Sequence, residues 1–543
     1  MIRYTGLFPN WFARISQVRP FMYQRLFLLL FAAALLGGSL GCGPEVAPRV
    51  PPADLQPKLD PLPVAMKQVK AEPLPATREL WSVIYMQDKK VGHSHVTIGV
   101  VKDGEQTLIH SHNRSELTLD REGSRLTQRL ELQSWETLNG KVVRFESRMT
   151  AGPGEIIAQG RAGEGGMIVS TDTVGKKVTK FVAWPEKCGG YFAVDQSLEK
   201  LPLKPGETRT VAGLVPIFNQ PGEAQLTALE EEEVSLRGLT QKLLKIKNEI
   251  TIAGQTLTSF CWINDKGEIL KTFDPTFKQE SILTTKEFAL AKNDLGKIDL
   301  LAATTVPLKG ELPSARPVEQ AVYLARLTGD QKIEGQFATD EFQQLEKVDD
   351  QTARLKITEL DRSSKVDEAL RGEKPVAADS AANSLVQSDD PAVIQLANLI
   401  AADEKEPLTI ALALEKGVRQ HISKRSYAQA FATAAEVVRS QEGDCTEHAV
   451  LLAAVCRARK IPARVVLGLV YYPPQKGFAY HMWNEVWIGD RWLPLDATVA
   501  QGTVGADHIK LRHANLQGES AYAVMLPLLQ VVGRLELEVV EAN

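Results

Sequence analysis

Residues 79–290 alternate between apolar and polar side chains, and no other pattern restricts the folding of the chain as strongly. An alternation of period two puts apolar side chains on one face of a β-strand and polar side chains on the other. Turn signals interrupt it at Asp103-Gly104, Asn139-Gly140, Pro153-Gly154, Pro205-Gly206 and Lys266-Gly267. Strands joined by such turns pair antiparallel. The sequence therefore predicts a large antiparallel β-rich domain over residues 77–300.

The rest of the chain divides into further units, since 543 residues are too many for one hydrophobic core. Residues 301–388 carry a less regular pattern, which predicts a mixed α/β connecting region. Helical periodicity begins at Asp390-Pro391, because proline suits the first helical position, and it predicts helices over Ala392–Ala402 and Pro407–Ile422. The last unit spans residues 389–543, and the fold class is expected to be α+β.

Composition narrows the class of partner. Hydrophobic residues make up 44% of the chain and charged residues 24%, as in ordinary globular proteins. The net charge is −4 and no block of basic residues stands out. Nucleic-acid binding therefore has no support in the sequence.

Residues 1–42 have the order of an export signal. Arg14, Arg19 and Arg25 precede an apolar run of 11 residues, Leu26–Leu36. Such a run suits a signal peptide and is short for a membrane span. The small residues before Cys42 resemble a bacterial lipobox, although Ser39 and Leu40 depart from its usual pattern. We therefore expect lipidation at Cys42, with simple cleavage near Gly41 or an uncleaved anchor as the alternatives.

Residues 43–76 contain nine prolines, a composition typical of a semi-extended tether. A tether directly after Cys42 would hold a folded body away from a membrane surface. The expected location is the bacterial cell envelope, with the protein anchored to a membrane through Cys42, or secreted if Cys42 is not lipidated.

The chain has five cysteines, too few for a disulfide scaffold in a protein of this size. A disulfide between Cys188 and Cys261 is an open possibility, because the sequence does not show whether the two residues are close in space. Cys456 lies three helical turns after Cys445 on one predicted helix, so these two cannot bond.

Cys445 is predicted to stand at the start of a helix. Gly443 permits a tight entry, Asp444 can cap, and Glu447 completes the spacing of a capping box. The helix is expected to end before Pro462. Free backbone amides and the helix dipole at such a position favour a thiolate, and the same amides can hold an oxyanion.

His481 and Asp496 are predicted to share one face of a β-hairpin. His481 begins the strand Tyr480–Ile488, and Gly489-Asp490 forms a two-residue turn before the return strand. Ile488 then faces Arg491, which places Asp496 diagonal to His481 within hydrogen-bonding reach. A slip of one residue would turn Asp496 to the other face.

Each of the three residues has a structural explanation when taken alone, but their order matches a thiol-enzyme triad. Four segments carry a resemblance to the transglutaminase-like superfamily: Gly443–Cys445, Leu451–Arg464, His481–Trp487 and Trp492–Asp496. The resemblance covers about residues 427–498. It implies a papain-like α+β core with Cys445 as nucleophile, His481 as base and Asp496 as the orienting acid, and no cofactor. Tyr427 is a candidate for the family's oxyanion aromatic, with a core role equally open.

The resemblance implies a thiol acyl-transfer enzyme that acts on protein or peptide amides through a Cys445 thioester, and the predicted export signal makes it an exported one. The acceptor is either water, in a protease or amidase, or an amine, in a transglutaminase. A catalytically silent peptide-binding lipoprotein and an envelope scaffold are the alternatives. The substrate, the membrane, the oligomeric state and the role of the β-rich domain are not readable from the sequence.

Two further groups of residues stay open at this point. A two-residue turn at Asp103-Gly104 would pair His95 with His112 and put both on one sheet face with His93 and His110. Four imidazoles can bind Zn²⁺ or Cu²⁺, but a solvated polar face is the favoured interpretation, and no metal site is predicted. A second group, Trp483, Trp487 and Trp492, could either wall a substrate cleft or pack against the helices.

Overall fold

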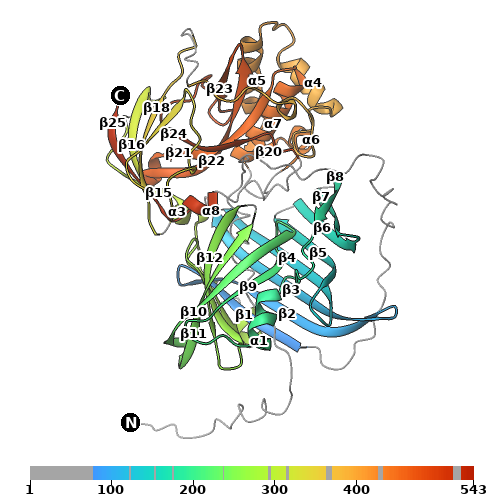
Figure 1. Ribbon diagram of the computed structural model, residues 1–543. Coiled ribbons are helices and arrows are strands. Elements are labelled where there is room, and N and C mark those ends of the chain that lie inside the picture. The colour runs from blue at the N-terminus through green and yellow to red at the C-terminus, as the bar shows by residue number, and fades with distance from the viewer. Residues whose placement is uncertain are drawn as a thin grey trace, which may run out of the picture.

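The computed structural model describes residues 78–121, 124–151, 154–173, 176–236, 238–252, 254–291, 295–313, 317–329, 331–362, 370–425, 432–517 and 528–543 (Figure 1). The predicted export signal, the predicted lipidation site Cys42, the proline-rich tether and Tyr427 lie outside these residues. Among the helices that the structure describes, none is long and apolar enough to span a membrane.

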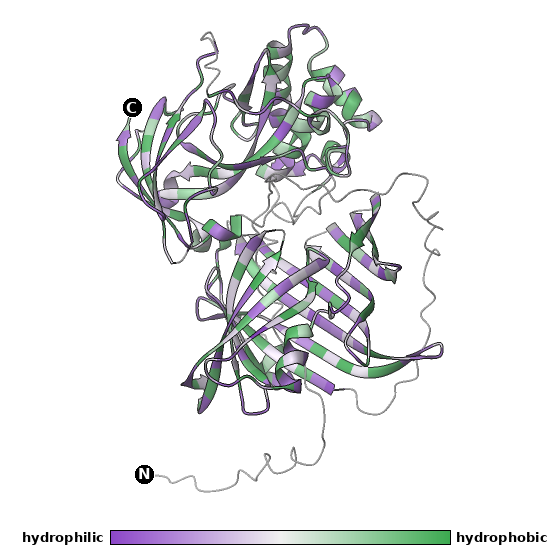
Figure 2. Ribbon diagram, in the orientation of Figure 1, coloured by the Kyte–Doolittle hydropathy of each residue, from purple (hydrophilic) through white to green (hydrophobic). Residues whose placement is uncertain are grey.

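Fourteen strands of the described residues form one antiparallel sheet, which confirms the predicted β-rich domain. From β1 the chain steps strand by strand to β8 at one edge, crosses to β9 at the other edge, and returns to β14, which pairs with β1. Hydrophilic and hydrophobic residues alternate along these strands in Figure 2, as period two requires. The bounds are β1 (Arg78–Met86), β2 (Lys89–Asp103), β3 (Gln106–Arg121), β4 (Ser124–Thr137), β5 (Val142–Ala151), β6 (Gly154–Gly163), β7 (Gly166–Thr173), β8 (Lys176–Ala183), β9 (Thr208–Val215), β10 (Gln220–Leu236), β11 (Leu239–Ile252), β12 (Gln255–Ile263), β13 (Ile269–Asp274) and β14 (Gln279–Thr284).

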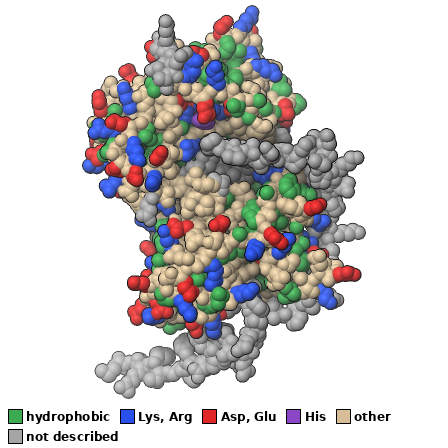
Figure 3. Space-filling view, viewed as in Figure 1, with side chains coloured by type: hydrophobic (Ala, Val, Ile, Leu, Met, Phe, Trp, Pro, Cys, Tyr) green, Lys and Arg blue, Asp and Glu red, His purple; other side chains and the backbone are tan. Residues whose placement is uncertain are grey.

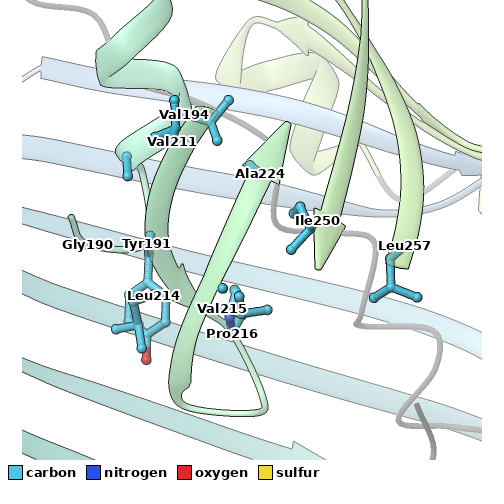
Figure 4. Close-up of a pocket in the computed structure, with 13 residues that line it drawn as sticks. Gly190, Tyr191, Val194, Val211, Leu214, Val215, Pro216, Ala224, Ile250 and Leu257 are labelled. Carbon is cyan, nitrogen blue, oxygen red and sulfur yellow. The ribbon is translucent and has the colours of Figure 1, made fainter. Parts of the chain in front are cut away.

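Helix α1 (Ala193–Lys200) packs on one side of this sheet. Its Val194 and Leu198 join a buried cluster with side chains of β10 to β13. A small hollow of about 40 Å³ lies beside the helix, between Val194 and residues of β9 to β12 such as Leu214 and Leu257 (Figure 4). Its lining carries no carboxylate, amine, imidazole or thiol. This hollow is therefore part of the packing and offers no chemistry.

The pairing of β2 with β3 corrects the register predicted for the histidines. The chain turns at Gly104-Glu105, so Asp103 pairs with Gln106 and His95 pairs with Arg114 instead of His112. Gly104 has a positive φ of 59°, a conformation that glycine adopts at no steric cost, and it therefore takes the first position of the turn. The offset of two residues keeps the histidines on one face but moves His112 away from His95.

Nine strands form a second sheet, in the order β17-β18-β16-β25-β15-β22-β21-β24 with β23 beside β22. Residues 301–388 contribute four of them: β15 (Val306–Lys309), β16 (Gln320–Leu327), β17 (Gln343–Lys347) and β18 (Thr352–Thr358). The others are β21 (Ala463–Tyr472), β22 (Gly477–Ile488), β23 (Arg491–Leu495), β24 (His508–Ala514) and β25 (Leu535–Ala542). Two short strands, β19 (Lys424–Arg425) and β20 (Glu442–Gly443), pair in parallel.

Helix α7 (Cys445–Ala458) is the central helix of this second part, buried from Thr446 to Arg457. It packs against β21 and β22 and is surrounded by α4 (Pro391–Ile400), α5 (Pro407–His421) and α6 (Ala434–Ser440). Asp390 caps α4 with Pro391 at its first position, which confirms the predicted helix start. The remaining α-helices of the described residues are α2 (Lys286–Leu290), α3 (Leu300–Thr304) and α8 (Leu528–Val531), and two 3-10 helices, η5 (Ala377–Asp379) and η6 (Pro473–Gln475), complete the helical elements. Acidic and basic side chains are interspersed over the face shown in Figure 3.

Candidate active site

Cys445 is the first residue of α7, and the predicted capping box is confirmed. The Asp444 carboxylate accepts a hydrogen bond from the Thr446 N–H at 2.8 Å, and Glu447 accepts one from the Asp444 N–H at 2.9 Å. Gly443 is needed for this entry, because a Cβ there would lie 2.3 Å from the Glu447 Cβ. The Cys445 side chain is partly exposed, and the Asp444 cap takes the N–H groups of the following residues rather than that of Cys445 itself.

The hairpin register that the sequence predicts is also confirmed. Ile488 pairs with Arg491, and the pairing continues to Asn484 and Leu495. Asp496 directly follows the end of β23, and its Oδ2 lies 2.8 Å from the Nε2 of His481. The structure thus brings together all three residues of the predicted triad.

The Cys445 thiol hydrogen-bonds the His481 imidazole. Because the Nε2 of His481 is held by Asp496, the Nδ1 remains for the thiol. Burial alone would lower the pKa of His481, but the charge of Asp496 and hydrogen bonds to Asp496 and Cys445 raise it to about 10. His481 is therefore an imidazolium at neutral pH.

Asp496 has more partners than sequence reasoning found. Its Oδ1 accepts hydrogen bonds from the Thr498 N–H at 2.8 Å and the Thr498 hydroxyl at 2.7 Å. Its Oδ2 is shared with a second imidazole, the Nε2 of His508, at 3.3 Å. Burial opposes ionisation of Asp496, but His481 and His508 hold its pKa well below the usual range. Asp496 is therefore a buried carboxylate that stays charged.

His508 was missed because no local pattern marks it. It opens β24, which reaches the site by pairing with β21. Its Nδ1 lies 3.0 Å from the Asp507 carboxylate, and this carboxylate and Asp496 raise the pKa of His508 against the effect of burial. The one sequence feature that could have pointed to His508 is the acidic residue directly before it, Asp507. The result is a chain of contacts from Asp507 through His508 and Asp496 to His481.

Glu415 of α5 was missed as well. Its Oε1 accepts a hydrogen bond from the Asp496 N–H at 3.0 Å, which fixes the backbone where β23 ends. Burial raises the pKa of Glu415 to about 7, and the nearby charge of Asp496 adds to the rise. Glu415 contacts the reacting groups only through Asp496, so it acts as a support.

A cleft of about 480 Å³ opens in front of Cys445, a volume within the range of about 300–1,000 Å³ common for ligand sites. The three predicted tryptophans do not line it. Trp483 is 1% exposed and stacks against His481, with ring centroids 6.1 Å apart. Trp487 packs against Trp492, edge to face. The packing interpretation of this group therefore holds.

Metal-ligating side chains gather at one place within the described ranges. The ligand atoms of His481, Asp496 and His508 lie within 4.8 Å of one another, and each is already hydrogen-bonded to a neighbour in the group. The sheet histidines have separate partners instead. His95 contacts Glu79 at 2.9 Å, His110 contacts Gln133 at 3.1 Å, His112 contacts Glu131 at 2.5 Å, and His93 stacks on Trp81. Cys188, Cys261 and Cys456 are buried free thiols.

The transglutaminase-like superfamily matches residues 394–497, the part of the chain that holds Cys445 and His481 and ends just after Asp496. This match supports a thiol enzyme. No curated protein matches the chain.

Three solved structures are similar to parts of the chain. One is a candidate cysteine protease of Cytophaga hutchinsonii, at 15% identity over 42% of this chain and 86% of that one, with a TM-score of 0.26. A β-barrel-like protein of unknown function from Brucella abortus has 7% identity over 38% and 96%, with a TM-score of 0.30. A candidate protease of Parabacteroides distasonis has 11% identity over 63% and 64%, with a TM-score of 0.18.

Proposed function

We propose that the transglutaminase-like domain makes this chain a thiol acyl-transfer enzyme that acts on protein or peptide amides through a thioester on Cys445. One observation carries the proposal. A partly exposed cysteine at the start of a capped helix is hydrogen-bonded to an imidazolium, which a buried carboxylate holds in place. That arrangement supplies a nucleophile, a proton donor and an orienting acid.

The first half of the reaction forms the thioester. The Cys445 thiolate attacks the carbonyl carbon of the amide, a C–S bond forms, and negative charge develops on the carbonyl oxygen. The Cys445 N–H, which the Asp444 cap leaves unused, is the backbone donor at the start of α7 that can stabilise that charge. The C–N bond then breaks as the His481 imidazolium donates its proton to the leaving nitrogen. Cys445 now carries the acyl group, and His481 is neutral.

The second half releases the acyl group. Neutral His481 takes a proton from the acceptor, whose oxygen or nitrogen attacks the thioester carbonyl. The C–S bond breaks, and the thiolate and imidazolium return. Water as acceptor gives hydrolysis, and an amine gives transamidation. We favour hydrolysis, because the cleft is open to solvent, where water is abundant.

The proposed location is the bacterial cell envelope, with the enzyme anchored through a lipid on Cys42. The support is the apolar run before Cys42 and the proline-rich tether after it. Mass analysis of the processed N-terminus tests this part separately. A diacylated Cys42 is the expected result, and an unmodified N-terminus after cleavage near Gly41 would exclude the anchor.

The test of function is a search for the thioester. The protein is incubated with a peptide library, quenched in acid and weighed intact, and residue 445 is then mapped for an acyl mass. The expected result is an adduct on the parent that is absent from Cys445→Ala and from His481→Gln. Labelled water and a labelled amine in the same reaction identify the acceptor. If no peptide is acylated or cleaved while Cys445→Ala still binds peptides, the domain is a binding module and the enzyme proposal is wrong.

A further inference from the structure

Arg419 is a cation in the cleft that the reaction does not use. It lies in the last turn of α5 and is the only lysine or arginine among the described residues that line the cleft with Cys445. Its side chain is exposed, and no hydrogen bond or ion pair of Arg419 is found in the described part of the chain. The guanidinium is therefore available to a ligand.

The carboxylates of the cleft are occupied by other partners. Asp444 caps α7 through the Thr446 N–H, and Asp496 accepts from His481 and His508. Neither lies within ion-pair distance of Arg419. Most of the remaining lining is apolar or aromatic, including Leu301, Ile422, Val470, Tyr472 and Val499. A positive charge beside apolar walls is screened less than one in open water, so it discriminates more strongly between charged and neutral substrates.

His448 is a second unmatched group in the lining of the same cleft. It lies one turn after Cys445 on α7, and its Nδ1 is 2.6 Å from the Asp444 carbonyl oxygen. A carbonyl only accepts, so Nδ1 carries the proton. Burial and the charge of Arg419 lower the pKa of His448, so the ring is neutral and Nε2 is an acceptor. This Nε2 is buried and lacks a hydrogen-bond partner among the described residues.

We propose that the substrate is an acidic peptide, with a carboxylate that pairs with Arg419 and a backbone N–H that donates to the Nε2 of His448. The inference rests on the proposed function and names its substrate class. Arginine suits the carboxylate because its guanidinium binds both oxygens at once. The carboxylate comes either from an Asp or Glu side chain near the scissile amide or from the peptide's C-terminus.

The experiment compares matched peptides on parent, Arg419→Gln and Arg419→Glu. Each peptide is made with Glu or Gln beside the scissile amide, and with a free or an amidated C-terminus, which separates the two carboxylate sources. We expect the parent to prefer the acidic member at least tenfold in kcat/KM, mainly through KM. Arg419→Gln should lose that preference, and Arg419→Glu should favour peptides with Lys at the same position. Lys416→Gln is the matched control, since it removes a positive charge from α5 outside the cleft lining.

His448→Phe completes the test, because it keeps a ring and removes the acceptor. It should raise KM for acidic peptides without moving the pH dependence of Cys445 alkylation. A preference for acidic peptides that survives in Arg419→Gln, or no such preference in the parent, overturns the inference. If no peptide is turned over at all, binding of the same peptides to Cys445→Ala is measured. Tighter binding of the acidic members would then support Arg419 even though the proposed chemistry had failed, and equal binding would reject it.

Discussion

Replacing Asp496 by asparagine removes the charge that holds His481 protonated while it keeps the size of the side chain. The pKa of His481 is about 10 against an ordinary 6.5, a difference of 3.5. At 1.36 kcal/mol for each pKa unit, Asp496 and Cys445 outweigh the opposing effect of burial and favour the imidazolium by a net of roughly 5 kcal/mol. Without the carboxylate, burial dominates and lowers the pKa of His481. The imidazole should then be neutral at pH 7, and the thiolate loses its counter-ion.

The assay is alkylation of Cys445 by iodoacetamide between pH 5 and 11, measured by mass spectrometry of the peptide that contains it. The other described cysteines are buried, and burial raises the pKa of Cys188, Cys261 and Cys456, so labelling is selective. We expect Asp496→Asn to label at least tenfold more slowly than the parent at pH 6. A tenfold difference in labelling rate corresponds to about 1.4 kcal/mol. It therefore requires only part of the roughly 5 kcal/mol that favours the imidazolium to stabilise the thiolate. The rates should converge above pH 10, where His481 loses its charge in the parent as well.

Asp490→Asn is the matched control, because it makes the same change of charge on an exposed turn of the same hairpin. It should label like the parent at every pH. The sign follows from the direction of the shift: a raised pKa keeps His481 charged below about 10 and loses the charge above it. Equal labelling of Asp496→Asn and the parent at pH 6 would refute the ion-pair reasoning.

Three further substitutions test the frame of the site. His508→Gln removes an imidazole that competes with His481 for the Asp496 carboxylate, so kcat should fall severalfold while the pKa of His481 rises, and the alkaline limb of Cys445 alkylation should move to higher pH, which a stopped-flow pH series measures. Glu485 is buried, and although burial opposes it, the charges of Lys510 and Arg464 lower its pKa to about 2. The ionised Glu485 should contribute roughly 3 kcal/mol to the free energy of unfolding above pH 4.5, and this contribution is lost as the pH falls toward 2. In Glu485→Gln, the free energy of unfolding measured in urea should therefore depend less on pH between 4.5 and 2. Asp444→Ala should lower the free energy of unfolding by about 1 kcal/mol and slow alkylation at pH 6, whereas Asp444→Ser keeps the cap.

The parts of the site that could be predicted from sequence are those set by neighbours along the chain. The start of α7 depends on Gly443, Asp444 and Glu447, which lie within five residues. The hairpin register depends on one turn, where Gly489 has a positive φ of 65°. The same local reasoning failed at β2 and β3, because the position of Gly104 within its turn decides the register and the dipeptide alone does not.

The parts that could not be predicted depend on long-range pairing. His508 reaches Asp496 only because β24 pairs with β21, and Glu415 reaches it only because α5 packs beside the end of β23. Neither contact leaves a pattern in the residues around it. Glu415 lies 81 residues from Asp496 in the sequence and His508 only 12, but in both cases the contact forms only once the sheet and α5 are assembled.

The contacts around Asp496 explain why a charge persists in a buried position. Removing a carboxylate from water costs several kcal/mol unless donors replace the lost water. Here the two oxygens receive four donors: His481 and His508 on one, and the Thr498 N–H and hydroxyl on the other. Two of the donors are imidazoles whose pKa values are raised, so they offer charge as well as hydrogen bonds. The ionised state of Asp496 is therefore maintained by the second histidine together with the catalytic one. A substitution of His508 should therefore change the reactivity of Cys445 through Asp496 and His481, without a direct contact between residues 508 and 445.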